Sequence, residues 1–254
     1  MVSCRISPGA RAFFTSRAGG VSRPPCGGPG GSGGLNLALH VGDDPADVVA
    51  NRARLERTLG PGLVWMDQVH GNTVRVAVDP AAAEAVGECD ALVIGPQVTG
   101  RAPAVLVADC APVLLADESG SVLAAVHVGR AGLFAGVLPA ALRRVRELTA
   151  EPVHAAVGPH ICGRCYEVGA ELSERARAFG AASTTTHGTP AIDLLAGIRG
   201  QLEGVPLTVI DACTVEDERW FSYRRDGVTG RFAGLAVRNG DTPPAIRRWA
   251  DALG

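Results

Sequence analysis

The chain contains no lysine, and all 24 of its basic residues are arginine. This absence excludes several kinds of active site, because a Walker A phosphate loop, a Schiff-base enzyme and a Ser–Lys dyad each require a lysine. An enzyme built on this chain must therefore hold an anionic substrate with arginine side chains or backbone N–H groups.

The sequence also lacks a hydrophobic signal core at its N-terminus and any apolar run of membrane-spanning length. Its formal net charge of −2 gives no general attraction to nucleic acid or to anionic membranes. Its seven cysteines are an odd number without regular spacing, which does not suggest a disulfide framework. We therefore expect a cytoplasmic protein with reduced thiols, which binds small molecules and neither nucleic acid nor membranes. We expect it to be a monomer.

Length and composition favour a single large core. The 254 residues are 46% hydrophobic, so we expect one domain that spans residues 1–254. Short apolar runs predict strands at 12–15, 64–66, 74–78, 91–94, 104–108, 113–116, 122–126, 154–157, 207–210 and 232–237. Helix signals predict helices in the segments 44–60, 133–149, 171–179 and 191–202.

Particular residues mark the helix ends. Asp44 is suited to cap the first helix, Pro45 to its first turn and Gly60 to its end. Within 133–149, Pro139 either kinks the helix or marks its true start. Because strands cluster in the middle of the chain and do not alternate regularly with helices, we predict an α+β fold, a layered α–β sandwich around a mixed β-sheet.

Three residues stand at the ends of buried apolar runs. They are His70, Cys110 and His127, which follow or end the runs 63–66, 104–108 and 122–126. Two imidazoles and one thiolate, with a fourth position left open, are typical of a catalytic zinc site. Two other interpretations stay open: packing residues of the core, or a Cys110 nucleophile with a histidine base.

Neighbouring residues suggest further roles. Asp109 is either a turn residue or a carboxylate that supports a metal ligand or transfers protons. Gln68 has the same strand parity as His70 and is expected to face the same side. Cys162 and Cys165 form a CxxC motif, but a structural zinc needs another pair of ligands, so we interpret them as a buried or incidental pair.

Eight ordered motifs resemble the YfiH/laccase-domain family, once called multicopper polyphenol oxidases. They are FFTSRAGGVS (13–22), LNLALHVGDDPADVVANRARL (35–55), DQVHGNTV (67–74), ECDALVIG (88–95), ADCAPVLLAD (108–117), AAVHVGRAGL (124–133), VGPHICGRCYEVG (157–169) and FSYRRDGVTGR (221–231). The resemblance implies a layered α–β fold and a zinc-dependent purine nucleoside phosphorylase with adenosine deaminase side activity. It also implies that His70, Cys110 and His127 bind the metal.

The resemblance directs attention to four substrate-binding candidates: Arg17, Asn36, Gln68 and Arg130. Arg17 and Asn36 lie in matching motifs near the expected pocket. Arg130 marks a departure, because it stands where family members commonly have tryptophan, and Ala131 stands where they have arginine. We expect Arg130 to replace the missing arginine. We interpret Arg224 and Arg225 as solvated charges in a turn.

Three functions remain as alternatives. The first is zinc-dependent phosphorolysis of adenosine, inosine, guanosine or methylthioadenosine, with adenosine deamination as a second activity. The second is a copper-dependent polyphenol oxidase, which the six histidines of the chain are too few to support fully. The third is a Cys/His or zinc amidohydrolase that acts on a cell-wall precursor.

Overall fold

The computed structural model describes residues 1–84 and 86–251. Two large mixed sheets form its centre. The five-stranded sheet has the order β1 (Val2–Ser7), β2 (Ala10–Phe14), β14 (Phe232–Arg238), β7 (Arg101–Val107), β4 (Gly62–Trp65). The six-stranded sheet has the order β13 (Leu207–Val209), β10 (Val153–Val157), β8 (Ala111–Asp117), β9 (Leu123–Val128), β6 (Ala91–Ile94), β5 (Val74–Ala77).

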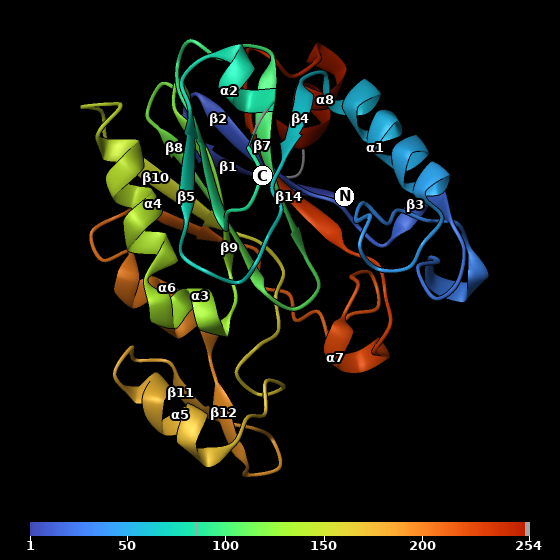
Figure 1. Cartoon of the computed structure of the whole chain (residues 1–254), viewed down its shortest axis with the longest axis vertical. Coiled ribbons are helices and arrows are strands. Elements are labelled where there is room, and N and C mark those ends of the chain that lie inside the picture. Colours follow the sequence, from blue (N-terminus) through green and yellow to red (C-terminus); the bar gives the residue numbers. More distant parts are fainter. Residues whose placement is uncertain (85, 252–254) are drawn as a thin grey trace.

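The two sheets pack face to face, and helices cover their outer faces (Figure 1). The six-stranded sheet is covered by α3 (Arg130–Ala135), α4 (Val137–Arg146) and α6 (Leu194–Gln201). The five-stranded sheet is covered by α1 (Pro45–Leu59) and α8 (Pro244–Asp251). The predicted layered α+β arrangement is therefore confirmed, and its layers contain two large mixed sheets where we expected one.

Smaller elements complete the fold. A two-stranded sheet pairs β11 (Ala182–Thr184) with β12 (Pro190–Ile192) beside α5 (Ala170–Arg177). Figure 1 shows this group below the main sheets, with α7 (Tyr223–Asp226) across from it. The remaining elements are β3 (Ala18–Ser22), α2 (Pro80–Glu84) and a short 3-10 turn at Pro29–Gly31.

Strand β8 shows why the central strands are continuous apolar runs. Ala111, Val113 and Leu115 belong to the core under the helices. Leu114 and Ala116 belong to the core between the two sheets. Because alternate side chains of a strand point to opposite faces and both faces are covered here, every position of β8 must be apolar or tolerate burial.

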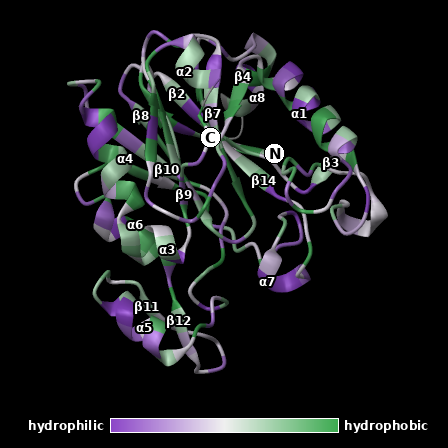
Figure 2. Cartoon of the chain, viewed as in Figure 1, coloured by the Kyte–Doolittle hydropathy of each residue, from purple (hydrophilic) through white to green (hydrophobic). Residues whose placement is uncertain are grey.

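The outer helices bury one face only. Helix α4 buries residues three and four positions apart: Val137, Leu138, Ala141, Leu142 and Val145. Figure 2 shows hydrophobic and hydrophilic residues alternating along α1 and α4. No helix in the described ranges is long and apolar enough to cross a membrane.

All ten predicted strands are present, but some boundaries and elements were wrong. The prediction missed β1, β3, β11 and β12. The helix expected over 133–149 is broken at Gly136, whose φ of 75° is left-handed, so Pro139 lies in the first turn of a new helix. The helix expected from residue 191 begins at Leu194, because Pro190–Ile192 pairs with β11.

Candidate metal centre

The structure brings three potential metal ligands together at one end of the core between the sheets. One donor atom each from His70, Cys110 and His127 lies within 4.8 Å of the other two. The imidazole rings of His70 and His127 are 4.6 Å apart between centroids, with an angle of 74° between their planes. Such a cluster of two imidazoles and one thiol fits one tetrahedral metal with an open position.

Each ligand is positioned by a different part of the sheets. His70 lies in the loop after β4. Cys110 lies in the turn between β7 and β8, where the chain passes from one large sheet to the other. Strand β9 extends beyond its predicted end to Val128, so His127 lies within the strand rather than after it.

The backbone at the site is held in an unusual conformation. His70 and Asp109 have positive φ angles of 62° and 94°. Residues other than glycine adopt such angles only where neighbouring groups hold them, and such positions cluster at functional sites. The Asp109 carboxylate is fixed by the Thr214 hydroxyl at 2.6 Å and by the backbone N–H of Arg224 at 2.7 Å.

Asp90 is a buried carboxylate that we did not predict from the sequence, and it orients two of the potential ligands. It accepts the backbone N–H groups of His70 at 2.9 Å and Gly71 at 2.7 Å. It also lies 2.8 Å from Nδ1 of His127. Since Nδ1 faces the carboxylate, Nε2 of His127 is the nitrogen available to a metal. We had considered Asp109 for this supporting role, but its carboxylate binds Thr214 and Arg224, whereas that of Asp90 contacts His127.

Electrostatics couples the ligands in the metal-free protein. Burial raises the pKa of the Cys110 thiol, but the charge and hydrogen bonds of His127 and His70 outweigh it and lower the pKa to about 6. Burial lowers the pKa of His127, but Cys110 and Asp90 together raise it to about 9. A thiolate beside an imidazolium is the resulting state at neutral pH, and a metal cation would take the place of the imidazolium proton.

Gly129 leaves room for the ligands. A Cβ atom at this position would lie 2.8 Å from Sγ of Cys110 and 3.4 Å from Cδ2 of His70. Any larger residue would therefore push the thiol or the imidazole out of place.

The triad opens into a cavity of about 830 Å³, within the usual range for small-molecule sites. Its walls come from the ends of β7 and β9, from the segment leading into α5, and from α7 and the loop between α7 and β14. Besides the triad, the polar and aromatic residues of its lining are His40, Gln68, Asp109, Arg130, Tyr166, Glu167, Tyr223, Arg224 and Arg231.

The predicted substrate-binding residues divide into two groups. Gln68 and Arg130 line the cavity. The Gln68 amide is already paired with the backbone N–H and C=O of Leu106, both at 2.8 Å, so it serves as part of the wall. Arg17 and Asn36 are absent from the lining.

The side chains of Arg17 and Asn36 are engaged elsewhere. Arg17 donates to the carbonyl of Gly27 and forms an ion pair with Asp226 at 2.8 Å. Asn36 is fully buried, and its amide oxygen accepts the backbone N–H of Arg231 at 2.9 Å. Both therefore support the loops around the cavity.

Two cavity arginines, Arg224 and Arg231, were not identified from the sequence. Both belong to the FSYRRDGVTGR motif, which was the only signal for them. We had interpreted Arg224 and Arg225 as solvated charges in a turn; both lie in α7, where Arg224 is exposed and also lines the cavity while Arg225 is half-buried. Arg224 lies over the Tyr166 ring, with its guanidinium carbon 5.4 Å from the ring centroid. Arg225 donates to the carbonyls of Thr214 and Trp220.

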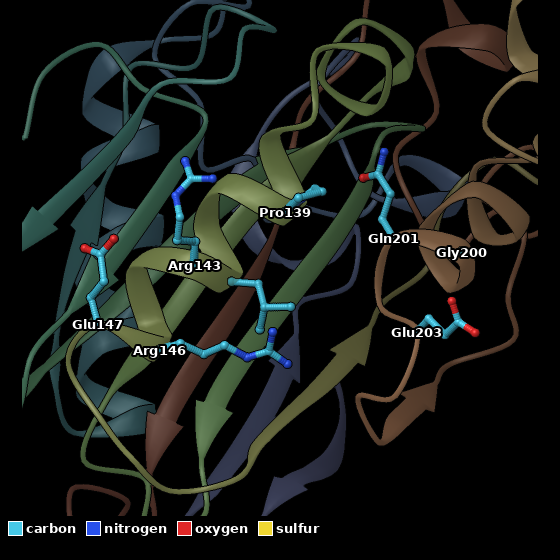
Figure 3. Close-up of a pocket in the computed structure, with 8 residues that line it drawn as sticks. Pro139, Arg143, Arg146, Glu147, Gly200, Gln201 and Glu203 are labelled. Carbon is cyan, nitrogen blue, oxygen red and sulfur yellow. The ribbon is translucent and has the colours of Figure 1, made fainter.

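A second hollow of about 440 Å³ lies between α4 and the end of α6 (Figure 3). Arg143, Arg146 and Glu147 line it from α4, and Gln201 and Glu203 from the other side. It shares no lining residue with the triad cavity and offers neither thiol nor imidazole. The triad cavity is therefore the better candidate for chemistry.

Comparison with known proteins agrees with the motifs. A sequence model described as multi-copper polyphenol oxidoreductase laccase matches residues 11–239. The chain belongs to this laccase-like family. It is 46% identical over 242 residues to a purine nucleoside phosphorylase of Streptomyces griseus, covering 90% of this chain and 94% of that one.

Other members of the laccase-like family are also similar. A purine nucleoside phosphorylase of Shigella flexneri, YfiH, is 38% identical over 241 residues, covering 91% of this chain and 94% of that one. A crystal structure of a Neisseria meningitidis protein has a TM-score of 0.79 and 33% identity, covering 94% of this chain and 99% of that one. The resemblance to the YfiH/laccase-domain family is thus confirmed.

We predict that Asp90→Asn weakens zinc binding about 10- to 100-fold, because the loss of charge loosens both histidine ligands. It should also lower the free energy of unfolding by about 1–3 kcal/mol. Asp117→Asn is the matched control, since Asp117 is a buried carboxylate that accepts the Val122 N–H and the Ser121 hydroxyl. The control should lose stability and keep its zinc affinity, both measured by titration and chemical denaturation. Native zinc affinity in Asp90→Asn would contradict the role of this carboxylate.

We predict that Cys110 in metal-free protein reacts with iodoacetamide with a midpoint near pH 6, where its thiolate forms. The rate should fall below that pH as the thiol becomes protonated. Cys4 is the internal control, because burial raises its pKa to about 11 and it should stay unreactive at neutral pH. Peptide mass spectrometry resolves the two sites. A midpoint at about 8.5, the value of a free cysteine, would show that the histidines do not act on Cys110.

Proposed function

We propose that this chain is a zinc-dependent purine nucleoside phosphorylase. Its substrates would be adenosine, inosine, guanosine or methylthioadenosine together with phosphate, and its products the free base and a ribose 1-phosphate (or its methylthio derivative). The observation that carries the proposal is a single cavity in which the His70, Cys110 and His127 cluster shares the lining with three arginines. Similarity to chains named purine nucleoside phosphorylase supports it.

The donor set of the triad suits zinc. Zinc accepts both imidazole nitrogen and thiolate sulfur, and three protein ligands are typical of its catalytic sites. Asp90 orients His127 in the way that carboxylates usually support zinc-bound histidines. When bound, zinc supplies a Lewis acid and a water of lowered pKa at this wall of the cavity.

The arginines suit the second substrate. Phosphorolysis breaks the bond between the ribose C1′ and the purine nitrogen, and a phosphate oxygen forms the new bond to C1′. Phosphate must therefore be held beside the ribose, and Arg130, Arg224 and Arg231 are the guanidinium groups on the cavity wall. This arrangement meets the requirement set by the absence of lysine.

The remaining lining suits the nucleoside. Tyr166 and Tyr223 offer flat aromatic surfaces, and Leu106, Ile161 and Leu172 offer apolar contacts. A purine base packs well against such surfaces, and carboxylates such as Glu167 can accept hydrogen bonds from ribose hydroxyls.

We further propose adenosine deamination as a second activity of the same cavity. The reaction adds oxygen from water at C6 of the purine and releases ammonia, so a proton must reach the departing amino group. Asp109 is our candidate for this proton transfer, because its carboxylate is fixed at the cavity wall by Thr214 and Arg224.

The older oxidase label finds less support in the ligands. A multicopper oxidase needs several copper sites rich in imidazole. Within residues 1–84 and 86–251, two groups of potential metal ligands are found, and only the triad contains histidine. A single site of two imidazoles and one thiol does not build a multicopper centre.

A thiol hydrolase is the second candidate, favoured by one observation. The thiolate of Cys110 beside protonated His127 is the arrangement of a cysteine nucleophile with its base, and an amide of a cell-wall precursor would be its substrate. Metal content separates the two candidates, because a thiolate that binds zinc is not free to attack a substrate.

We predict that Cys110→Ala loses its triad zinc and its phosphorolysis of adenosine while it stays folded, at a cost of about 1–2 kcal/mol in stability. The assay measures adenine and ribose 1-phosphate, and metal analysis measures zinc. Cys4→Ala is the control and should behave like the native protein in both. Full phosphorolysis by Cys110→Ala would refute the metal-centred proposal. Loss of activity with unchanged zinc at the triad would favour the nucleophile instead.

We predict that Arg130→Ala raises the Michaelis constant for phosphate about tenfold or more, the expected loss for one charge-assisted contact. Its zinc content should not change. Arg143→Ala is the matched control, because Arg143 is an exposed arginine on α4 that lines the other hollow. An unchanged phosphate dependence in Arg130→Ala would assign the anion to Arg224 and Arg231 alone.

A further inference from the structure

We propose that Cys162, Cys165, Cys213 and Glu216 form a second metal site, which holds zinc as a structural clamp. The CxxC pair has no further ligands near it in the chain, and we therefore interpreted it as a buried or incidental pair. The structure supplies these ligands from a segment about 50 residues away, and the resulting site is independent of the proposed function.

The four donor atoms are already gathered. The three Sγ atoms and one carboxylate oxygen all lie within 4.8 Å of one another. Tetrahedral zinc with Zn–S bonds of about 2.3 Å would place its ligand atoms roughly 3.8 Å apart. Small side-chain rotations would therefore close the group around one ion, and four protein ligands are typical of a structural site without an open position.

Glu216 is oriented as a ligand. Its Oε1 atom faces the thiols, 3.3 Å from Sγ of Cys165 and 3.9 Å from Sγ of Cys162. Arg164 donates to its Oε2 atom at 3.1 Å and, at a longer distance of 3.4 Å, to Oε1. One oxygen can thus bind a metal while the other keeps its arginine, which limits the rotation of the carboxylate.

Neighbouring strands bring the two segments together. Strands β10 and β13 are parallel neighbours, and the loops that follow them carry the CxxC turn and Cys213. Backbone bonds between His160 and Ala212 (3.2 Å) and between Thr214 and His160 (3.1 Å) hold the loops side by side. The backbone N–H of Cys162 points at Sγ of Cys213 at 3.4 Å, a contact that stabilises a thiolate.

The donor set of the cluster suits a soft divalent cation. Three thiols and a carboxylate lie close together. Metal coordination would favour the thiolate form of the cysteines. Soft thiolate ligands select zinc over magnesium or calcium.

The clamp would support the substrate cavity. Thr214, next to Cys213, donates its hydroxyl to Asp109 at 2.6 Å, and the N–H of Ile161 donates to the Asp109 carbonyl at 2.9 Å. Ile161, Tyr166 and Glu167 line the cavity on either side of the CxxC turn. A metal that joins the two loops therefore fixes this wall.

The test counts zinc in full-length protein that has been equilibrated with zinc under a non-thiol reductant and dialysed. We expect two zinc ions per chain in the native protein, one in Cys165→Ser, one in Cys110→Ala and none in the double variant. Cys4→Ser is the matched control, because Cys4 lies outside both ligand groups, and it should keep two. Glu216→Gln is a milder second variant and should weaken zinc binding at this site about tenfold or more while it stays folded.

Cobalt distinguishes the two sites in the same proteins. Charge-transfer absorption from thiolate to cobalt(II) grows with the number of thiolate ligands, so Cys110→Ala should keep the stronger band and Cys165→Ser should lose most of it. Two zinc ions in Cys165→Ser, or none in Cys110→Ala, would overturn the proposal. Native protein that carries a disulfide between these cysteines and takes up no second metal under the reductant would overturn it as well.

Discussion

The carboxylate of Asp90 is the constraint on which the triad depends. Asp90 directly precedes β6 and is fully buried. Its oxygens accept hydrogen bonds from the turn that carries His70, and one of them lies next to Nδ1 of His127. One side chain therefore fixes a loop from one large sheet against a strand of the other. A buried charge is stable only when it is fully hydrogen-bonded, and the turn and the imidazole together provide these bonds.

The two-sheet core explains where the chemistry lies. Cys110 stands where the chain crosses from β7 to β8, at the open end of the core between the sheets. The core below is packed with aliphatic and aromatic side chains, so the triad has a rigid base. The cavity walls are loops, which can vary without disturbing the strands. Its arginines come from β9–α3 and from the segment around α7.

Local signals in the sequence were sufficient for ten of the strands, for the α1 caps and for the candidate triad residues. A strand buried on both faces is a conspicuous apolar run. His70 and Cys110 lie in the loops that follow β4 and β7, and His127 lies near the end of β9. Contacts between segments that are distant in the sequence could not be predicted. Asp90 contacts His127, and Cys213 contacts Cys162, only because distant segments meet, and the helix break at Gly136 depends on one left-handed residue. Arg17 and Asn36 lie in matching motifs, yet their hydrogen bonds hold loops and do not face the cavity.

The most direct test of the central claim is anomalous diffraction at the zinc edge from crystals of the native protein equilibrated with zinc. The account predicts a strong peak bonded to Nε2 of His127, to Sγ of Cys110 and to an imidazole nitrogen of His70, with its open side toward the cavity. Absence of a peak between these three residues, with zinc bound elsewhere, would contradict the assignment of the triad as the metal centre.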